Sequence, residues 1–162
     1  MLLLNDLYVD VEKLNDEESD LLGKKLFCEQ FLNQGKRGVF ILHDGSEVFF
    51  FEDRYEHAFH TSCDRIRKPY SKLKIARDRI SRVKWIKPII QGKIAGTECW
   101  EVYSHQNKQR LYIIYAKKYL IWLESRKDGK WKFSTAYTVN ASDIRRYTAR
   151  GRKIWEVNNN AP

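Results

Sequence analysis

The sequence predicts an α+β fold, in which N-terminal helices and a short hairpin precede a four-stranded antiparallel meander. Three observations predict it. Apolar residues recur at helical spacing over residues 15–35, an Asp-Gly pair separates two short apolar runs between residues 39 and 51, and alternating runs rich in Trp, Tyr, Ile and Val follow residue 97. Helices first and strands afterwards is the α+β layout, with the helices packed on one face of a sheet.

The first segment is acidic and helical in pattern. We expect an acidic helical segment over 1–35 and a basic α+β domain over 36–162 of the 162 residues. Asn15 or Asp16 can cap a helix whose first turn holds acids, as the helix dipole favours. The helix ends near Gly35, and its apolar stripe consists of Leu22, Leu26, Phe27 and Phe31.

The next section reads as a hairpin followed by two helices. Runs 39–42 and 47–51 are joined through His43-Asp44-Gly45-Ser46, a strong hairpin signal. From Asp53 to about Ile90 we expect two helices, capped by Asp53 and Ser71 and broken at Lys68-Pro69. Pro88 and Gly92 end the second helix, whose apolar face consists of Leu73, Ile80, Val83, Trp85 and Ile86.

The last section changes to the period of strands. Runs 98–103, 109–115, 119–125 and 130–139 form the predicted meander, a short helix covers 142–147, and Ile154 and Trp155 pin the C-terminus to the core. Strict alternation places one set of side chains on a single face of the last strand, namely Trp131, Phe133, Thr135 and Tyr137. The opposite face then carries Lys132, Ser134 and Ala136.

Charge and cysteine content restrict the function classes. The net charge is +9, but residues 1–23 carry seven acids and one lysine, so the rest of the chain carries +15. Such a surplus favours a polyanion, most often nucleic acid, over the alternative of a solvated lysine-rich surface. Three cysteines cannot form a closed disulfide framework and predict reduced thiols in a cytoplasmic protein. Secretion and membrane spanning are disfavoured, because the apolar run 1–4 is short and no run of about 18 apolar residues follows.

Polar residues that could do chemistry gather on the first predicted helix of the third section and on the last strand. His57 and His60 share a helix face at spacing i, i+3. Together with Cys63 they offer a zinc alternative, but on a continuous helix the outer two ligands would lie about 9 Å apart along the axis. We therefore expect no metal and no cofactor. Phosphate loops, GxSxG elbows and HExxH strings are absent from the sequence.

A combination of motifs resembles a known family. A Glu56-His57 helix follows the Asp44-Gly45 hairpin, Arg79-Ile80 leads to Pro88, and the meander ends in Phe133-Ser134-Thr135-Ala136-Tyr137. Over roughly residues 38–156 this resembles the phage-associated branch of the barnase, EndoU, colicin and RelE-like (BECR) ribonuclease superfamily. The resemblance implies N-terminal helices on a four-stranded sheet and RNA cleavage without a metal. It also implies a catalytic histidine at His57 and catalytic strand residues at Ser134, Thr135 and Tyr137. The cationic role varies among members of the superfamily, and Arg110 and Arg79 are its candidates here. His60 joins the catalytic candidates because it shares the predicted helix face with His57.

Such cleavage needs a base for the 2′-hydroxyl proton, an acid for the leaving 5′-oxygen, and cations or donors for the phosphorane. His57 suits proton transfer, and Thr135 and Tyr137 suit donation to a phosphate oxygen. The ordinary alternatives are a surface histidine and β-forming residues in a half-buried strand. The candidate RNA-binding residues, which could equally form a solvated face, are Lys74, Arg77, Arg79, Arg82 and Lys132.

We therefore expect a metal-independent RNA endonuclease, used as a toxin or a phage-encoded effector, with a non-catalytic nucleic-acid-binding module as the alternative. The expected partners are RNA, with tRNA as one candidate, and a protein antidote, without a membrane. The acidic N-terminal helix either screens the basic surface or is simply an added helix of the core, and the well-formed apolar stripe favours the second interpretation.

Overall fold

The protein has an α+β fold built on one mixed sheet of seven strands. The computed structural model describes residues 2–62, 73–104 and 107–158. The strand order is β1-β2-β8-β7-β6-β5-β9, and every neighbouring pair is antiparallel except β2 and β8. The strands are β1 (Arg37–Ile41), β2 (Glu47–Phe51), β5 (Thr97–Ser104), β6 (Asn107–Ile114), β7 (Tyr119–Ser125), β8 (Trp131–Thr138) and β9 (Gly151–Glu156).

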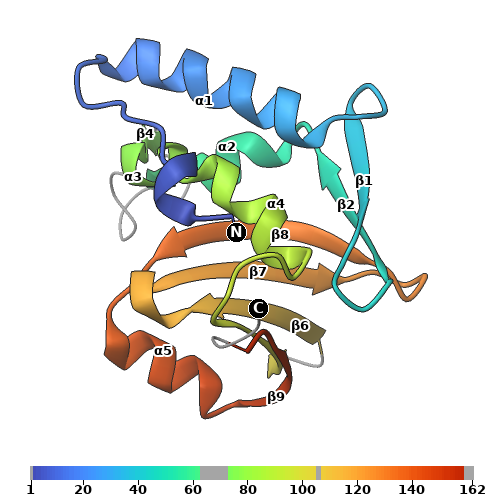
Figure 1. The fold of residues 1–162 in the computed structure, drawn as a ribbon. Helices are drawn as coiled ribbons and strands as arrows, with labels where there is room; N and C mark the ends of the chain where they lie inside the picture. The colour runs from blue at the N-terminus through green and yellow to red at the C-terminus, as the bar shows by residue number, and fades with distance from the viewer. Residues whose placement is uncertain (1, 63–72, 105–106, 159–162) are drawn as a thin grey trace.

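Helices cover both faces of this sheet unequally (Figure 1). One face, which we call the helix face, carries α1 (Asp16–Phe31), α2 (Arg54–Phe59), α3 (Arg77–Ile80) and α4 (Ile86–Ile90), with the 3₁₀ turns η1 (Leu4–Leu7) and η2 (Val83–Trp85). Of the helices in the described residues, α5 (Ala141–Thr148) alone lies on the opposite face, which we call the outer face. A third 3₁₀ turn, η3 (Tyr115–Lys117), follows β6, and β3 (His60–Ser62) pairs with β4 (Leu73–Ile75) in a separate small sheet.

Helix α1 is part of the main core. Asn15 and Glu18 form a reciprocal capping box at its start, as the predicted cap implied. Phe27 and Phe31 are fully buried, and the Phe31 ring stacks on Phe50 of β2 with centroids 4.3 Å apart. The acidic N-terminal helix therefore packs with the rest of the chain around one core, rather than as an appendage.

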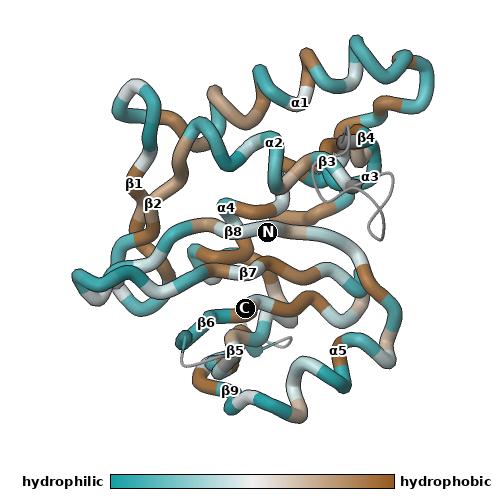
Figure 2. Tube along the Cα trace, turned by 180° about the vertical axis from the view of Figure 1, so that it is seen from behind, coloured by the Kyte–Doolittle hydropathy of each residue, from teal (hydrophilic) through white to brown (hydrophobic). Residues whose placement is uncertain are grey.

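The outer face has a smaller core that covers only part of the sheet. Ile144 of α5 packs on apolar residues of the central strands, which are Val102, Leu111, Ile113, Leu120 and Trp122. Figure 2 shows the hydrophobic colour concentrated along the central strands, whereas the turn between β7 and β8 is hydrophilic. None of the helices that the structure describes covers the end of the outer face next to that turn.

The third section differs from its prediction. Helix α2 has six residues and ends before His60, whose extended backbone begins β3, so His57 and His60 do not share a helix face. Asp53 makes no side-chain capping bond. The predicted second helix is replaced by β4 and three short helical turns, α3, η2 and α4, although Ile80, Val83, Trp85 and Ile86 are buried as expected. Lys68-Pro69, Ser71 and Cys63 lie outside the described residues.

Pro88 lies in the first turn of α4 instead of ending a helix. Proline is tolerated there because the amide hydrogens of a first turn have no partner within the helix. Gly92 follows with a φ of 77°, as a residue after a helix end should.

The strict alternation predicted for β8 is wrong. The register between β7 and β8 shifts between Trp122 and Leu123, so that Leu123 pairs with Phe133 while Trp122 pairs with Thr135. This β-bulge turns the strand, and Phe133 and Ala136 both belong to the helix-face core while Tyr137 packs on the outer face.

The sheet is also larger than the four strands predicted. The hairpin β1-β2 joins it at β8, and β9, which was not predicted as a strand, pairs with β5. None of the described helices is long and apolar enough to cross a membrane. Cys28 and Cys99 are free thiols.

Candidate nucleic-acid interface

A split in the sheet lies between β2 and β8. These strands pair at only two positions, Val48 with Trp131 and Phe49 with Lys132. Beyond them, Arg54 of α2 occupies the opened edge of β8. Its Nε donates to the Ser134 carbonyl at 2.6 Å, and Nη2 donates to the Ser134 hydroxyl at 3.0 Å. The Arg54 guanidinium, in place of a neighbouring strand, therefore supplies hydrogen bonds to this part of the β8 edge.

A groove of about 760 Å³ lies at the uncovered end of the outer face, beside the turn between β7 and β8. We call it the outer groove. Its lining is Phe51, Asn107, Lys108, Gln109, Glu124, Ser125, Arg126, Lys127, Asp128 and Lys132. Four of these residues are basic and two are acidic, so the groove carries a local positive charge suited to an anion.

Directly paired residues form a row across four strands, and the three from β6, β7 and β8 line this groove. Gln109 of β6 pairs with Glu124 of β7, Glu124 pairs with Lys132 of β8, and Lys132 pairs with Phe49 of β2. The Ser134 hydroxyl donates to Glu124 Oε1 at 3.2 Å, and Lys132 Nζ lies 3.5 Å from Glu124 Oε2. The row therefore holds an amide, a carboxylate, an ammonium group and an aromatic ring in fixed order.

Aromatic rings and cations are combined at the β2 side of the groove. The rings of Phe49 and Phe51 lie nearly parallel, 6.1 Å between centroids and 9° between planes. The Arg126 guanidinium lies 4.1 Å from the Phe49 centroid and 5.8 Å from the Phe51 centroid. Phe51 is half-buried and lines the groove, so flat groups and positive charges meet at one place.

A second polar group, the His43 cluster, lies on the helix face at the same end of the sheet. It consists of His43, Asp44 and Ser46 of the hairpin turn and of Cys99, Glu101, Arg110 and Tyr112 of β5 and β6. Arg110 is 6% exposed and pairs with Leu123 on the helix face. Its Nη1 lies 3.0 Å from Asp44 Oδ2, and its guanidinium lies 4.5 Å from the Trp131 centroid.

Two aromatic neighbours hold the His43 ring in place. Its Nδ1 lies 2.8 Å from the Tyr112 hydroxyl, and its ring stacks on Trp155 at 3.8 Å. Partial burial lowers the pKa of His43, and the positive charge of Arg110 lowers it further, against an opposing effect of Asp44. His43 is therefore neutral at pH 7, and Nε2 is the ring atom left for proton transfer.

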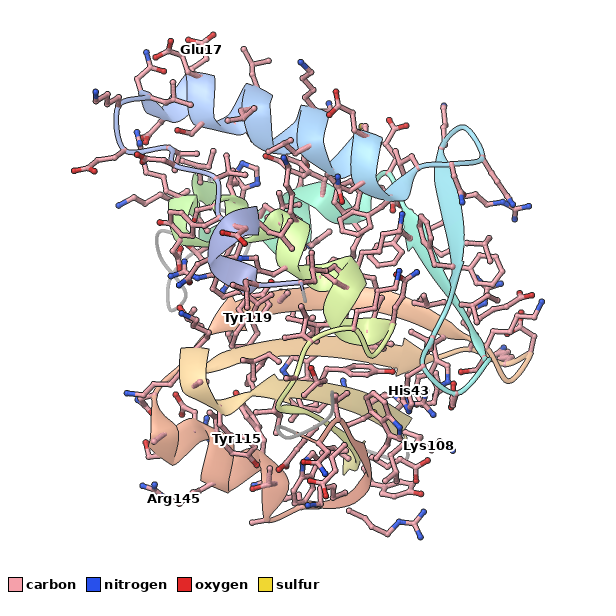
Figure 3. All side chains as sticks on the ribbon, viewed as in Figure 1. Glu17, His43, Lys108, Tyr115, Tyr119 and Arg145 are labelled. Carbon is pink, nitrogen blue, oxygen red and sulfur yellow. The ribbon has the colours of Figure 1, made fainter. Side chains whose placement is uncertain are left out.

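Lys108 connects the groove to the His43 cluster. It lines the outer groove, its Nζ lies 3.4 Å from Glu101 Oε1, and it lies 5.8 Å from the Trp131 centroid. Figure 3 shows His43 and Lys108 at one end of the sheet, whereas Arg145 of α5 lies at the other. A strand in the groove would thus pass close to the cluster.

The six predicted catalytic residues are not brought together. Within the described ranges, no hydrogen bond or ion pair joins any two of them. His57 is exposed on α2. His60 Nδ1 lies 3.1 Å from the Glu56 carbonyl, and Nε2 lies 3.3 Å from Asp20 Oδ1. Ser134 bonds Arg54 and Glu124, and Arg110 belongs to the His43 cluster.

Thr135 and Tyr137 lie towards the α5 side of β8. Trp122 Nε1 donates to the Tyr137 hydroxyl at 3.0 Å, and the Arg79 guanidinium lies 5.0 Å from the Tyr137 centroid. Burial, with a hydrogen bond to Tyr147, raises the pKa of Tyr137 to about 12. Tyr137 therefore stays protonated at pH 7, and could act on a phosphate only as a hydrogen-bond donor.

Of the predicted RNA-binding residues, Lys132 lines the outer groove and Lys74 is exposed on β4. The three arginines have structural contacts elsewhere. Arg77 pairs with Asp16 at 2.8 Å, Arg79 donates to the Ala58 carbonyl at 3.2 Å, and Arg82 donates to the Asp78 carbonyl at 2.7 Å. These contacts place the arginines among the N-terminal helices and turns, away from the groove.

A second cavity, of about 790 Å³, lies between α1, α2 and the end of β2 and contains His60. Four acids and two lysines line it, so its charge opposes phosphate binding. Among residues 2–62, 73–104 and 107–158, no group of three His, Cys, Asp or Glu side chains could hold a metal ion.

Sequence reasoning did not select His43, Glu101, Glu124 or Phe51 as functional residues. The only signal for His43 was its place in the hairpin turn, and its partner Tyr112 is 69 positions away. Comparison with known proteins adds nothing to the site: no family model matches the chain, and no curated protein or solved structure gave a significant match.

Proposed function

We propose that this protein binds single-stranded RNA in the outer groove. The main support is that four basic residues and the half-buried ring of Phe51 line one groove at the uncovered end of the sheet. Proteins that bind single strands combine a positive track for phosphates with aromatic surfaces on which bases stack. Unpaired bases are accessible to such a surface, whereas the deep major groove of an RNA duplex is not.

The second cavity, which shares Phe51 with the outer groove, is a poorer phosphate site. Its four acids outnumber its two lysines and would repel a phosphate backbone. Within the outer groove, Lys127 is exposed and Arg126 and Lys132 are partly exposed, so these positive charges can meet a ligand.

The test is a pair of charge-matched double variants in a fluorescence-anisotropy titration with single-stranded RNA. Arg126→Gln with Lys127→Gln removes two charges from the groove, and we expect affinity to fall at least about tenfold. The control, Arg145→Gln with Arg146→Gln, removes two charges from exposed positions of α5 and should change affinity less than about twofold. Equal losses in both doubles would contradict binding in the groove.

Metal-independent RNA cleavage is a second candidate, favoured by the neutral His43 beside the Arg110 guanidinium and close to Lys108. In 2′-hydroxyl attack, His43 Nε2 would take the proton of the hydroxyl, and the cations would stabilise the phosphorane. The P–O5′ bond then breaks, a proton from the His43 imidazolium or from water goes to the leaving 5′-oxygen, and a 2′,3′-cyclic phosphate remains. The BECR resemblance supports this candidate through the antiparallel order β5 to β8 after N-terminal helices. His57, exposed on α2, remains the alternative base.

An RNA cleavage assay distinguishes RNA cleavage from RNA binding alone. Purified protein is incubated with total RNA and tRNA in EDTA, and fragments ending in 2′,3′-cyclic phosphate are sought. If it cleaves, His43→Ala should lower the rate by at least about 10²-fold, while His57→Ala reports on the alternative base. Absence of fragments, with RNA binding intact, leaves a binding module. Full activity in folded His43→Ala would remove His43 from the site.

A further inference from the structure

We propose that the outer groove prefers a nucleobase with an amino group over uracil, and that Glu124 makes this choice. The inference rests on the proposed RNA binding and specifies which strand binds best. The structure supplies the starting point: Glu124 stands in the middle of the row of paired residues, and 38% of its side chain is exposed.

The Glu124 carboxylate is held in place but not saturated. Oε1 accepts one hydrogen bond from Ser134, and Oε2 lies beside Lys132 Nζ. Ser134 is itself held by the Arg54 guanidinium, so the orientation of Glu124 is fixed from behind. A carboxylate has about four acceptor positions, which leaves about two for a ligand.

The other acid of the groove lacks this freedom. Both oxygens of Asp128 lie 3.3 Å from Arg126 Nε, and Oδ1 also accepts from the Lys130 amide at 3.0 Å. Asp128 therefore fastens the turn between β7 and β8. Glu124 is the carboxylate of this lining that projects from a strand, between polar neighbours on the two adjacent strands.

Neighbouring strands are about 4.8 Å apart, so a base lying on Glu124 also reaches Gln109 or Lys132. The Phe51 ring and the Arg126 guanidinium offer flat surfaces for stacking nearby. The edge of the base, rather than its face, can then meet the carboxylate.

The chemistry of the row discriminates between bases. Adenine, cytosine and guanine each carry an amino group that can donate to the carboxylate. Adenine and cytosine present a ring acceptor beside it, which Gln109 or Lys132 can satisfy. Uracil has carbonyl oxygens in place of an amino group, and its one ring N–H lies between two of them. A carboxylate that accepts from this N–H therefore has a carbonyl oxygen beside it and is repelled by that oxygen. Uracil is therefore the base that the row disfavours.

The test uses oligo(rC), oligo(rA) and oligo(rU) of about eight nucleotides, a length within the usual site size of a single-strand groove, in anisotropy titrations. Wild-type protein should bind oligo(rC) and oligo(rA) about tenfold more tightly than oligo(rU). Glu124→Gln should reduce that ratio to between about one and two, because an amide both donates and accepts. Asp128→Asn removes the same charge from the same groove and should leave the ratio unchanged.

Three results would overturn the inference in different ways. If the wild-type protein binds all three strands equally, the base preference is contradicted, but the proposed RNA binding is retained. A preference that persists in Glu124→Gln, or that disappears equally in Asp128→Asn, removes Glu124 from the choice. No binding of any strand contradicts the proposed function itself. Thermal melting of each variant confirms that the compared proteins are folded.

Discussion

At the scale of single residues, the His43 cluster shows how burial sets the charge state of a side chain. His43 is packed on Trp155 and lies near Arg110, and both partial burial and that positive charge favour its neutral form. Asp44, in contrast, keeps its charge. Burial would raise the pKa of Asp44, but hydrogen bonds from Ser46 and the charge of Arg110 lower it overall, so Asp44 stays ionised beside the arginine.

The lowered pKa of His43 predicts a loss of stability in mild acid. In the unfolded chain, His43 takes up a proton at its ordinary pKa near 6.5, whereas the folded form takes it up at a lower pH. The unfolded state therefore binds more protons just below pH 6.5, and the free energy of unfolding falls as the pH falls from 6.5 towards the folded pKa. Asp44 titrates below this window, since its pKa is lowered from 3.8.

The measurement is urea unfolding at pH 7.5 and pH 5.0 for wild type and for His43→Gln, whose amide can still bond the Tyr112 hydroxyl. The variant should lose less stability between the two pH values than wild type. An identical loss in both proteins would show that other groups carry the pH dependence.

Residue chemistry was predictable from the sequence only where partners are close along the chain. Asn15 and Glu18 of the capping box are three positions apart, and the sequence predicted a cap at Asn15 or Asp16. Arg110 was selected as a cation, but its partners Asp44 and Trp131 come from other parts of the chain. The groove is built from β2, β6, β7 and β8, so its membership depends on strand pairing that residue types do not specify.

At the scale of elements, α1, the hairpin β1-β2 and strands β5 to β8 were predictable, whereas β9 and the third section were not. Periodic apolar residues and an Asp-Gly turn are local signals, and β1, β2 and α1 lie where these signals place them. The apolar spacing of 80–86 fits a helix equally well as separate turns that bury the same residues. The bulge in β8 arises from pairing with β7, so alternation within β8 alone could not reveal it.

Helix α1 should contribute strongly to stability through one ring. Phe27 is fully buried and contacts the rings of Phe31, Phe50, Tyr55, Phe59 and Phe133. Phe27→Ala should lower the free energy of unfolding by about 3–5 kcal/mol, because it leaves a cavity in this cluster. Leu21→Ala on the same helix, where Leu21 is 67% exposed, should change it by less than about 0.5 kcal/mol.

Denaturant unfolding of both variants measures the difference. A small effect of Phe27→Ala would mean that α1 can detach from the core, and would revive the idea of an acidic helix that screens the basic surface. A large effect makes the helix an integral part of the fold.

At the scale of the whole molecule, the acidic helix α1 and the outer groove lie on opposite faces of the sheet. Acidic α1 lies on the helix face (Figure 1), and the groove lies on the other face beside the turn between β7 and β8. Seven of the acids in the chain fall within residues 1–23, while the remainder of the chain carries +15. A polyanion in the outer groove is therefore separated by the sheet from the acids of α1.

This separation predicts a steep but limited dependence of RNA affinity on salt. If the four basic residues of the groove each neutralise one phosphate, log affinity should fall with log salt at a slope of about −3, from about −0.7 per phosphate of a single strand. Anisotropy titrations over a series of salt concentrations give the slope.

Removing Arg126 and Lys127 should bring the slope to about −1.4, because two phosphate contacts remain. The α5 double variant should keep the wild-type slope, since its arginines lie outside the groove. A slope near zero in wild type would exclude a polyanion partner. A steep slope shared by all three proteins would instead assign binding to charges spread over the surface, because only contacts in the groove are lost with Arg126 and Lys127.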